Sequence, residues 1–282
     1  MNDSTLAQAR LSVSIVLYNS PLELVYGTVQ SLRSSAQCAR DAGSLGHVTV
    51  WLVDNASDTA YRDALQAQID GWPASAWFDV RYAPQPCNLG FGYGHNSVLP
   101  ALTSDFHLVL NPDVELQDDT LQAGLTALRQ ASDIALLSPR VVGSNGEQEF
   151  LCKRYPTVLA LLLRGFAPAF VRHLFQRQLA SYEMRDLCSG EATADVEIAS
   201  GCFMLIRTAA LRAIGGFDEA FFLYFEDFDL SLRLPPQGRL VFDPAMRIVH
   251  HGGYAASKGH LHLRYFIRSG VRFFNRHGWR FL

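Results

Sequence analysis

Short apolar runs alternate with helical patterns through the first half of the chain, and no other feature constrains the fold as strongly. Each run is rich in Val, Ile, Leu or Phe and stops at a cluster of Asn, Asp, Ser, Pro or Gly, as strands do. Strands and helices that alternate at such short spacing indicate βαβ units in a parallel sheet. We therefore predict a Rossmann-like first half with strands at 11–17, 48–53, 78–82 and 106–110.

The fourth run stops at Asn111-Pro112-Asp113, directly after a nearly uncharged strand pattern. Pro112 cannot donate to a sheet ladder, so pairing ends there and Asp113 lies at the carboxyl end of the strand. Ligands of open α/β sheets bind at this edge, where a carboxylate can hold a divalent metal or a ribose. The alternative is an ordinary turn started by Asn-Pro-Asp. Asp54 also ends a strand, and it either accepts from a nucleobase or ribose or makes an Asx turn or helix cap.

The rhythm changes in the second half, after an expected helix at 120–130 and a strand at 134–142. Residues 151–191 combine six Lys and Arg with many Leu and Phe, as in one or two basic amphipathic helices. They form either a packed lid whose basic residues face water or a surface that meets a membrane or an anionic acceptor. Beyond them we expect a strand at 196–206 interrupted at Ser200-Gly201, a short helix capped by Thr208, and strands at 239–242 and 246–249.

Three acids, Glu226, Asp227 and Asp229, lie within four residues in an aromatic stretch. A helix start favours acids through its dipole, and we expect this effect to account for Glu226 and Asp229 as solvated residues. Asp227 is flanked by Phe225 and Phe228. It is therefore the acid that we expect in a perturbed environment, with a chemical role.

The charge is distributed unevenly along the chain. A formal net charge of −3 argues against a general nucleic-acid binder. Residues 239–282 nevertheless hold eight Lys or Arg against one Asp, and from Arg264 to Arg280 an Arg recurs at every fourth position. On an expected helix at 261–282 this spacing lays down a basic stripe, which is either a solvated face or a surface attracted to anionic lipid or phosphate.

The cysteines and the N-terminus favour a cytoplasmic protein. The five cysteines show no Cys-x-x-Cys spacing, so neither a disulfide framework nor a zinc site is indicated. Residues 1–10 lack the basic and apolar regions of a secretory signal. No apolar stretch approaches the roughly 20 residues that a membrane-spanning helix needs.

Seven motifs in this order resemble those of inverting family-two glycosyltransferases, and they are most similar to the rhamnosyltransferase branch of that family. The motifs extend over residues 12–253. They are Val53-Asp54-Asn55-Ala56-Ser57, Asn88-Leu-Gly-Phe-Gly-x-Gly-x-Asn96, Leu110-Asn-Pro-Asp113, Ser200-Gly201, Gly216-Phe-Asp-Glu219, Phe221-Phe-Leu-Tyr-Phe-Glu-Asp-x-Asp-Leu-x-Leu-Arg233 and Val249-His-His-Gly-Gly253.

The resemblance implies the A-type glycosyltransferase fold, an α/β fold with a Rossmann-like, mostly parallel central sheet flanked by helices. It implies one domain over 1–282, with a nucleotide-sugar-binding half at 11–115 and an acceptor-binding half at 116–260 that contains the helical insert 151–191. The implied reaction moves a sugar, foremost L-rhamnose from dTDP-L-rhamnose, to a hydroxyl of a glycan or lipid-linked acceptor in surface polysaccharide or lipopolysaccharide synthesis. The insert and the C-terminal helix would define the acceptor and seat the enzyme at the inner membrane face.

The resemblance also implies roles for individual residues. Asp227 would be the general base, beside Glu226, and Asp113 with His250 would hold Mg²⁺ or Mn²⁺, with His251 as the second candidate. Position 111 is Asn where the family's Asp-x-Asp metal motif has Asp, which leaves strict metal dependence open. The remaining residues would contact the nucleotide sugar or shape its pocket: Asn19, Asp54, Asn88, Gly90, Asn96, Asn111, Ser200 and Gly201.

Two alternatives stay open. The same fold and mechanism could use a UDP-sugar, because no single residue recognises a rhamnose methyl group. A non-catalytic sugar-nucleotide-binding module would need no base at Asp227. A nucleotidyltransferase is disfavoured, since the loop after the first strand begins Tyr18-Asn19-Ser20 and is not the glycine-rich, basic loop of that class.

Overall fold

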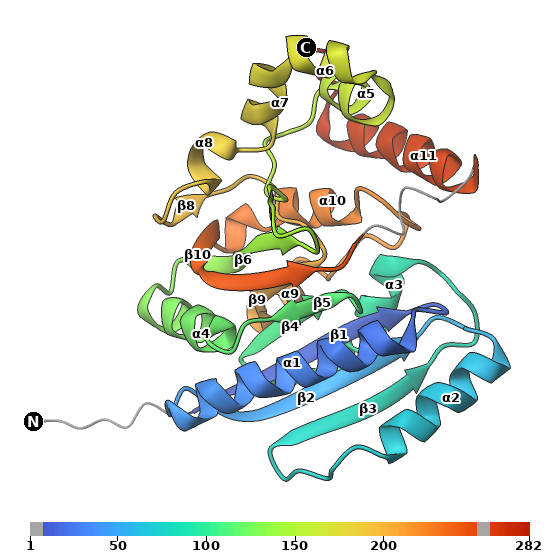
Figure 1. Ribbon diagram of the computed structural model, residues 1–282, viewed down its shortest axis with the longest axis vertical. Helices are drawn as coiled ribbons and strands as arrows, with labels where there is room; N and C mark the ends of the chain where they lie inside the picture. The colour runs from blue at the N-terminus through green and yellow to red at the C-terminus, as the bar shows by residue number, and fades with distance from the viewer. Residues whose placement is uncertain (1–7, 253–259) are drawn as a thin grey trace, which may run out of the picture.

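The computed structural model describes residues 8–252 and 260–282, and one curled sheet organises them (Figure 1). The strand order is β3-β2-β1-β4-β9-β6-β10-β5, with β7 paired to β6 and β8 paired to β10. The strands are β1 Ala9–Leu17, β2 Leu45–Asp54, β3 Phe78–Pro84, β4 Phe106–Leu110, β5 Val114–Leu116, β6 Ile134–Gly143, β7 Gln148–Glu149, β8 Ala194–Asp195, β9 Phe203–Arg207 and β10 Arg239–His250.

Helices flank this sheet and form the upper part of the view in Figure 1. The α-helices are α1 Leu22–Asp41, α2 Thr59–Asp70, α3 Phe91–Asn96, α4 Thr120–Gln130, α5 Val158–Phe166, α6 Ala169–Leu174, α7 Gln176–Tyr182, α8 Arg185–Cys188, α9 Thr208–Ala213, α10 Glu226–Arg233 and α11 His260–His277. Two 3₁₀ turns, η1 Leu99–Ala101 and η2 Pro235–Gln237, complete the described elements.

The first half has the predicted parallel arrangement. β1 pairs in parallel with β2 and β4, and β2 pairs in parallel with β3. All five residues of β4 are buried, which explains why its sequence is apolar on both faces. Helix α1 covers the sheet with an apolar stripe at helical spacing, formed by Val25, Val29, Leu32 and Ala36.

The second half departs from the simple alternation. β9 runs antiparallel between β4 and β6, so the whole sheet is mixed. The strand expected at 196–206 is shorter and later, because only Phe203–Arg207 pairs with β4, and only Leu205 and Ile206 of it also pair with β6. The two strands expected at 239–242 and 246–249 are one strand, β10, with a register shift between Asp243 and Arg247. Such a shift bends a strand without ending it.

The insert at 151–191 holds four short helices, α5 to α8, where we expected one or two. It lies beside α11 at the end of the molecule that carries the C-terminus (Figure 1). The backbone N–H of Val158 donates to the carbonyl of Arg280 at 2.8 Å, which fastens α5 to the C-terminal segment. Helix α11 ends at His277, so Arg280 lies beyond the helix, with its guanidinium 4.1 Å from the ring centre of Tyr155.

Within the described ranges, no helix has the length and apolar character to cross a membrane.

Candidate active site

The pairing of β4 with β9 brings two predicted site segments together. Leu110 lies opposite Phe203 in this antiparallel pair, and the Asn111 backbone N–H donates to the Cys202 carbonyl at 2.9 Å. The residues that follow β4 therefore meet the Ser200-Gly201 segment that precedes β9. Burial, opposed by the Ser200 hydroxyl and assisted by the charges of Asp113, Asp227 and Glu149, raises the pKa of the Cys202 thiol to about 12.

His250 faces Asp113 across the end of β10. Its Nε2 lies 3.6 Å from Asp113 Oδ1, and its Nδ1 lies 3.2 Å from Glu149 Oε2. His251 points elsewhere, with its Nε2 at 3.3 Å from Glu115 Oε1, although its backbone N–H donates to the Asp113 carbonyl. Of the two histidines, only His250 therefore directs a ring nitrogen toward Asp113. Gly253, the last residue of the histidine motif, lies outside the described residues.

Asp113 and His250 fit a cation that is shared with a substrate. Asp113 Oδ1 is buried and accepts no hydrogen bond from any described residue. Glu149 can accept from His250 Nδ1, which leaves Nε2 free to act as a ligand. No group of three or more His, Cys, Asp and Glu side chains in the described parts of the chain is placed to hold a metal. Two protein ligands suit Mg²⁺ or Mn²⁺ where phosphate oxygens and waters complete the shell.

Asp227 is held at the start of α10 by backbone donors. The Gly201 N–H donates to Asp227 Oδ2 at 2.9 Å, and the Phe228 N–H donates to Oδ1 at 2.9 Å. Two consecutive aromatic residues before it, Tyr224 and Phe225, adopt left-handed backbone conformations with φ of 69° and 66°. Such conformations cost about 1–3 kcal/mol each and persist where the surrounding structure imposes them. The loop is therefore held in a form that aims Asp227 at Gly201.

Gly201 has little room for a side chain. A Cβ at this position would lie 3.3 Å from Phe91 Cε1 and 3.4 Å from the Cβ of Asp227. The preceding residues are anchored to α10, because the Ala199 N–H donates to Ser231 Oγ at 3.1 Å. Ser200 is half-buried, and its Oγ accepts weakly from the Cys202 N–H at 3.4 Å. Close backbone approach thus explains the interruption at Ser200-Gly201.

Glu226 and Asp229 are buried, so our expectation that they are solvated is wrong. Burial, followed by the nearby charge of Asp227, raises the pKa of Glu226 well above its usual value. Burial also raises the pKa of Asp227, although the Gly201 and Phe228 N–H groups partly oppose this shift. Asp227 is half-buried and lines a pocket. The raised pKa agrees with the perturbed environment expected of Asp227, and its chemical role stays a prediction.

Asp229 joins α10 to α11. It forms ion pairs with Arg233 at 2.7 Å, with His277 Nε2 at 2.9 Å and with Arg276 at 3.3 Å, and its side chain is fully buried. His277 and Arg276 lie more than forty residues further along the chain, so no local pattern could reveal this role. Asp229 therefore positions α10 and is not part of the open site.

A pocket of about 390 Å³ opens in front of Glu226 and Asp227. It is lined by aromatic residues and by one end of the insert: Leu161, Arg164, Gly165, Tyr182, Tyr224, Phe225, Phe228 and Phe266. The sequence interpretation missed Arg164, Tyr182 and Glu149 as members of the site. Nothing in their local sequence distinguishes them, because the insert meets α10, and Glu149 of β7 meets His250, only in three dimensions.

The residues expected around the nucleobase lie at the ends of β1 and β2. Asn19 is exposed, and its side-chain oxygen accepts from the Asp58 N–H at 3.1 Å. Asp54 is fully buried, where it accepts from the Tyr82 hydroxyl at 2.9 Å and the Ser57 N–H at 3.0 Å and pairs with Arg62 at 3.0 Å. Burial and then Asp54 raise the pKa of Tyr82 to about 12. Both Asp54 oxygens thus have protein partners, in part through the Asx turn considered above.

The glycine-rich segment 88–96 packs against residues 216–222. Asn88 Oδ1 accepts from the Gly90 N–H at 3.0 Å. Gly90 has φ of 104°, and a Cβ there would lie 2.2 Å from the Phe222 carbonyl oxygen, so only glycine fits. Asn96 donates to the Phe217 carbonyl at 2.8 Å and to Glu219 at 3.0 Å, and accepts from the Phe217 N–H. Asn96 therefore fastens α3 to the 216–219 loop.

Solved structures define the class of fold. The chain superposes on the crystal structure of GalNAc-T7 with UDP, GalNAc and Mn²⁺ with a TM-score of 0.65 and 13% identity, over 95% of this chain and 48% of that chain. It superposes on mannosyltransferase PcManGT from Pyrobaculum calidifontis in complex with GDP-Man and Mn²⁺ with a TM-score of 0.62 and 15% identity, over 96% of this chain and 65% of that chain. The fold is the A-type glycosyltransferase fold.

The family follows from the sequence model of glycosyl transferase family 2, which matches residues 12–215. The chain belongs to this family and is a glycosyltransferase. It is 28% identical over 223 residues to the N-acetylglucosaminyl-diphospho-decaprenol L-rhamnosyltransferase of Mycobacterium tuberculosis, covering 75% of this chain and 69% of that protein. It is 25% identical over 176 residues to the rhamnosyltransferase WbbL of Escherichia coli K12, covering 57% of this chain and 61% of that protein. The predicted family and branch are confirmed.

Proposed function

We propose that this enzyme transfers L-rhamnose from dTDP-L-rhamnose, with inversion, to a hydroxyl of a lipid-linked or glycan acceptor in surface polysaccharide synthesis. The proposal rests mainly on the environment of Asp227. This half-buried carboxylate has a raised pKa and faces an aromatic pocket, near the end of β4 where Asp113 lies. The similarity to two rhamnosyltransferases supports the sugar. We place the reaction in the cytoplasm, with peripheral contact at the inner membrane face.

Asp227 acts as the general base in this scheme. Its carboxylate accepts the proton of the acceptor hydroxyl while that oxygen forms a bond to the anomeric carbon. The bond between the anomeric carbon and the diphosphate oxygen breaks, and the nucleoside diphosphate leaves with the electron pair. This single displacement needs one base, and the displacement inverts the configuration of the anomeric carbon. The Gly201 and Phe228 N–H groups fix the direction of the carboxylate, and Glu226 lies next to it as a second buried acid.

Asp113 and His250 lie where the diphosphate would develop charge as it leaves. They would hold Mg²⁺ or Mn²⁺ through Asp113 Oδ1 and His250 Nε2, and Glu149 would orient the histidine. When bound, the cation would supply charge neutralisation for the leaving diphosphate. Asn111 stands at the first position of the Asp-x-Asp metal motif, so the site carries one negative charge fewer than a motif with two carboxylates.

The first half binds the nucleoside in this proposal. Asn19 is exposed beside the end of β1 and is the residue best placed to contact a base, whereas Asp54 orders the surrounding loop through Tyr82 and Arg62. The wall of the nucleotide pocket is formed by Asn88, Gly90 and Asn96. The floor of the pocket, between the nucleotide and the general base Asp227, is formed by Asn111, Ser200 and Gly201. The main alternative is a UDP-sugar donor, because UDP appears with the solved GalNAc-T7 structure.

Calorimetric titration of dTDP, UDP and GDP with and without Mn²⁺ tests this site. We expect dTDP to bind most tightly in the presence of Mn²⁺, and Asp113→Ala to weaken binding by about tenfold or more, since it removes a charged metal ligand. Asp119→Ala is the matched control, because this exposed acid pairs with the exposed Arg247 and is not one of the proposed metal ligands. If UDP bound most tightly, the donor would be a UDP-sugar and not dTDP-L-rhamnose. Equal nucleotide affinity of wild type and Asp113→Ala in the presence of Mn²⁺ would refute Asp113 as a metal ligand.

A further inference from the structure

The insert forms a second pocket, next to the pocket of Asp227. It has a volume of about 810 Å³ and is lined mainly by α5, α6 and α7, with four arginines and one histidine in its wall: Arg164, Arg172, Arg177, Arg185 and His173. Arg164 also lines the smaller pocket that contains Asp227. The two pockets therefore adjoin, and a ligand of the arginine pocket would reach toward the proposed base.

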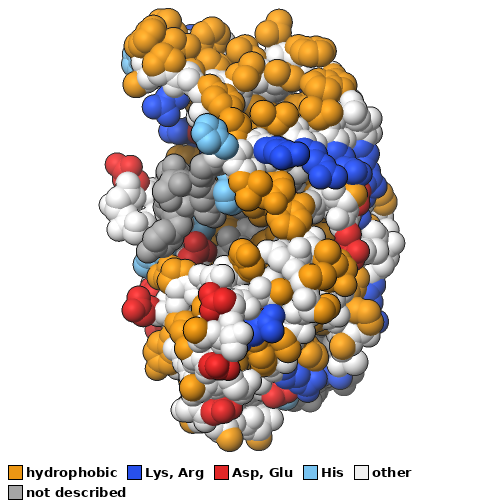
Figure 2. Space-filling model, turned by 90° about the vertical axis from the view of Figure 1, so that its right-hand side faces the viewer, with side chains coloured by type: hydrophobic (Ala, Val, Ile, Leu, Met, Phe, Trp, Pro, Cys, Tyr) orange, Lys and Arg blue, Asp and Glu red, His pale blue; other side chains and the backbone are white. Residues whose placement is uncertain are grey.

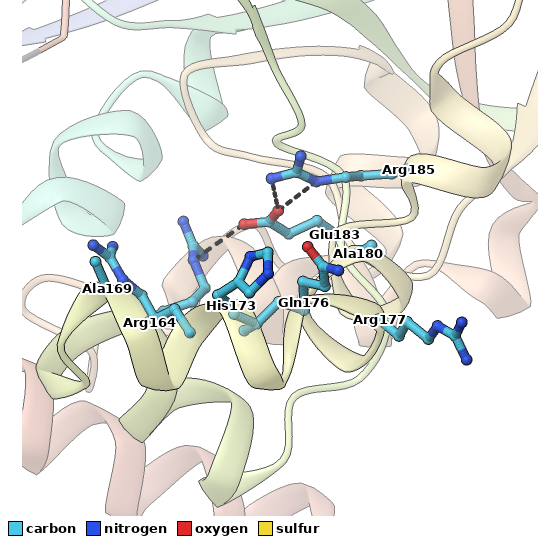
Figure 3. A pocket seen from close by; sticks show the side chains of 10 residues that line it. Arg164, Ala169, His173, Gln176, Arg177, Ala180, Glu183 and Arg185 are labelled. Atoms are coloured by element: carbon cyan, nitrogen blue, oxygen red, sulfur yellow. Dashed lines mark hydrogen bonds and ion pairs between the residues drawn. The ribbon is translucent and has the colours of Figure 1, made fainter.

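The arginine pocket has more positive charge than its own acids neutralise. Glu183 is the only acid in its lining, and it is approached by Arg185 at 2.6 Å, Arg164 at 3.4 Å and Lys153 at 3.9 Å. Figure 3 shows Arg164 and Arg185 reaching this carboxylate from opposite sides. In the described parts of the chain, no acid pairs with the guanidinium of Arg172 or Arg177. The wall thus holds three more positive than negative charges, which suits a polyanion.

The helix beside the pocket exposes an apolar surface to water. Helix α6 buries none of its residues, and Phe170 and Leu174 on it are 70% and 74% exposed. Leu162 and Phe166 of α5 are also exposed. Figure 2 shows hydrophobic side chains gathered over this end of the molecule, with a band of Lys and Arg beneath them. Exposed apolar surface of this kind marks a place where a partner or a lipid covers the protein.

We propose that the arginine pocket binds the diphosphate of a lipid-linked acceptor whose hydrocarbon chain lies along α5 and α6. Guanidinium groups bind phosphate oxygens in bidentate fashion, and a polyprenyl diphosphate has the required polyanionic head and apolar tail. The sugar attached to that head would extend past Arg164 toward Asp227. This inference rests on the proposed function, because it assigns the acceptor of the same reaction.

Vesicle flotation of the full chain tests the pocket. One set of phosphatidylcholine vesicles carries polyprenyl diphosphate, and a second set carries phosphatidylglycerol to the same total negative charge. We expect tighter binding to the diphosphate vesicles. Arg172→Gln with Arg177→Gln should weaken that binding about tenfold or more, because charge-assisted hydrogen bonds are lost. Both arginines are exposed, and neither pairs with an acid that the structure describes, so this double variant should fold normally.

The matched control removes the same charge from α11. Arg264→Gln with Arg268→Gln changes two exposed arginines outside the pocket, and it should keep the preference for diphosphate vesicles. An equal loss of this preference in both double variants would overturn the proposal, and so would equal binding of wild type to the two vesicle types. Either result would indicate a surface that binds anions in general.

Titration of dTDP into the same proteins separates the proposed acceptor site from the proposed nucleotide site. Intact dTDP binding with no diphosphate preference refutes only the acceptor site, and the reverse result refutes only the nucleotide site.

Discussion

Glu226 and Asp227 are neighbours in the chain but lie in different surroundings. Both line the same pocket, but Asp227 accepts from the Gly201 N–H, whereas Glu226 is 5% exposed and its Oε2 meets no hydrogen-bond donor among the described residues. Burial of an unpartnered carboxylate favours its protonated form. A protonated Glu226 would also limit the negative charge beside the base, because only one of the two acids would then be ionised.

Glu226→Gln should stabilise the protein increasingly as the pH rises. The raised pKa of Glu226 means that the folded state keeps a proton that the unfolded chain releases above about pH 4.3. Its contribution to stability is present at lower pH and is lost as the pH rises through the raised pKa. Gln stays neutral, so urea unfolding should show a larger gain at pH 8 than at pH 5. The same difference at both values would show that Glu226 is not held in its protonated form.

At the scale of elements, α10 is fixed by one buried acid. Asp229 joins it to α11 through Arg276 and His277, and to its own last turn through Arg233. Removing one partner of a buried ion pair leaves charges without compensation. The position of Asp227 at the start of α10 therefore depends on a contact made from the far side of the same helix.

Asp229→Ala should lower the free energy of unfolding by about 3–5 kcal/mol, because two or three cations lose their buried partner. Urea denaturation with far-UV circular dichroism measures this loss. Asp133→Ala is the control, since that acid pairs with Arg239 at the surface, where both side chains are largely exposed. A loss no larger than in the control would mean that α11 does not depend on Asp229 for its attachment.

The sequence predicted elements best where their signals are local. The parallel strands of the first half were found from apolar runs that end at Asn, Asp or Pro, and Pro112 marked the end of β4. The antiparallel direction of β9 was not predictable, because it depends on pairing with β4 and β6. The insert divides into four helices because Pro168, the non-helical Phe175 and the left-handed Met184 interrupt it. A basic amphipathic pattern in the sequence does not reveal such breaks.

At the scale of the whole molecule, the candidate site gathers residues from distant parts of the chain. Asp113 comes from the end of β4, His250 from the end of β10, and Gly201 and Asp227 from the loop and helix that close the second half. Ordered motifs predicted these residues, including His250 in preference to His251. The arginine pocket was not predicted as a site, because the arrangement of Arg164 between it and Asp227 arises only when the insert packs against α10.

The role of Asp227 as the base is tested by the rate of dTDP release from dTDP-L-rhamnose in the presence of a polyprenyl-diphosphate-linked sugar. Wild type and Asp227→Asn are compared, with dTDP affinity determined for both. We expect Asp227→Asn to lower the rate by about 10²–10⁴-fold, the usual contribution of a general base, while dTDP binds equally well. A rate in Asp227→Asn equal to that of wild type would contradict the assignment of Asp227 as the base.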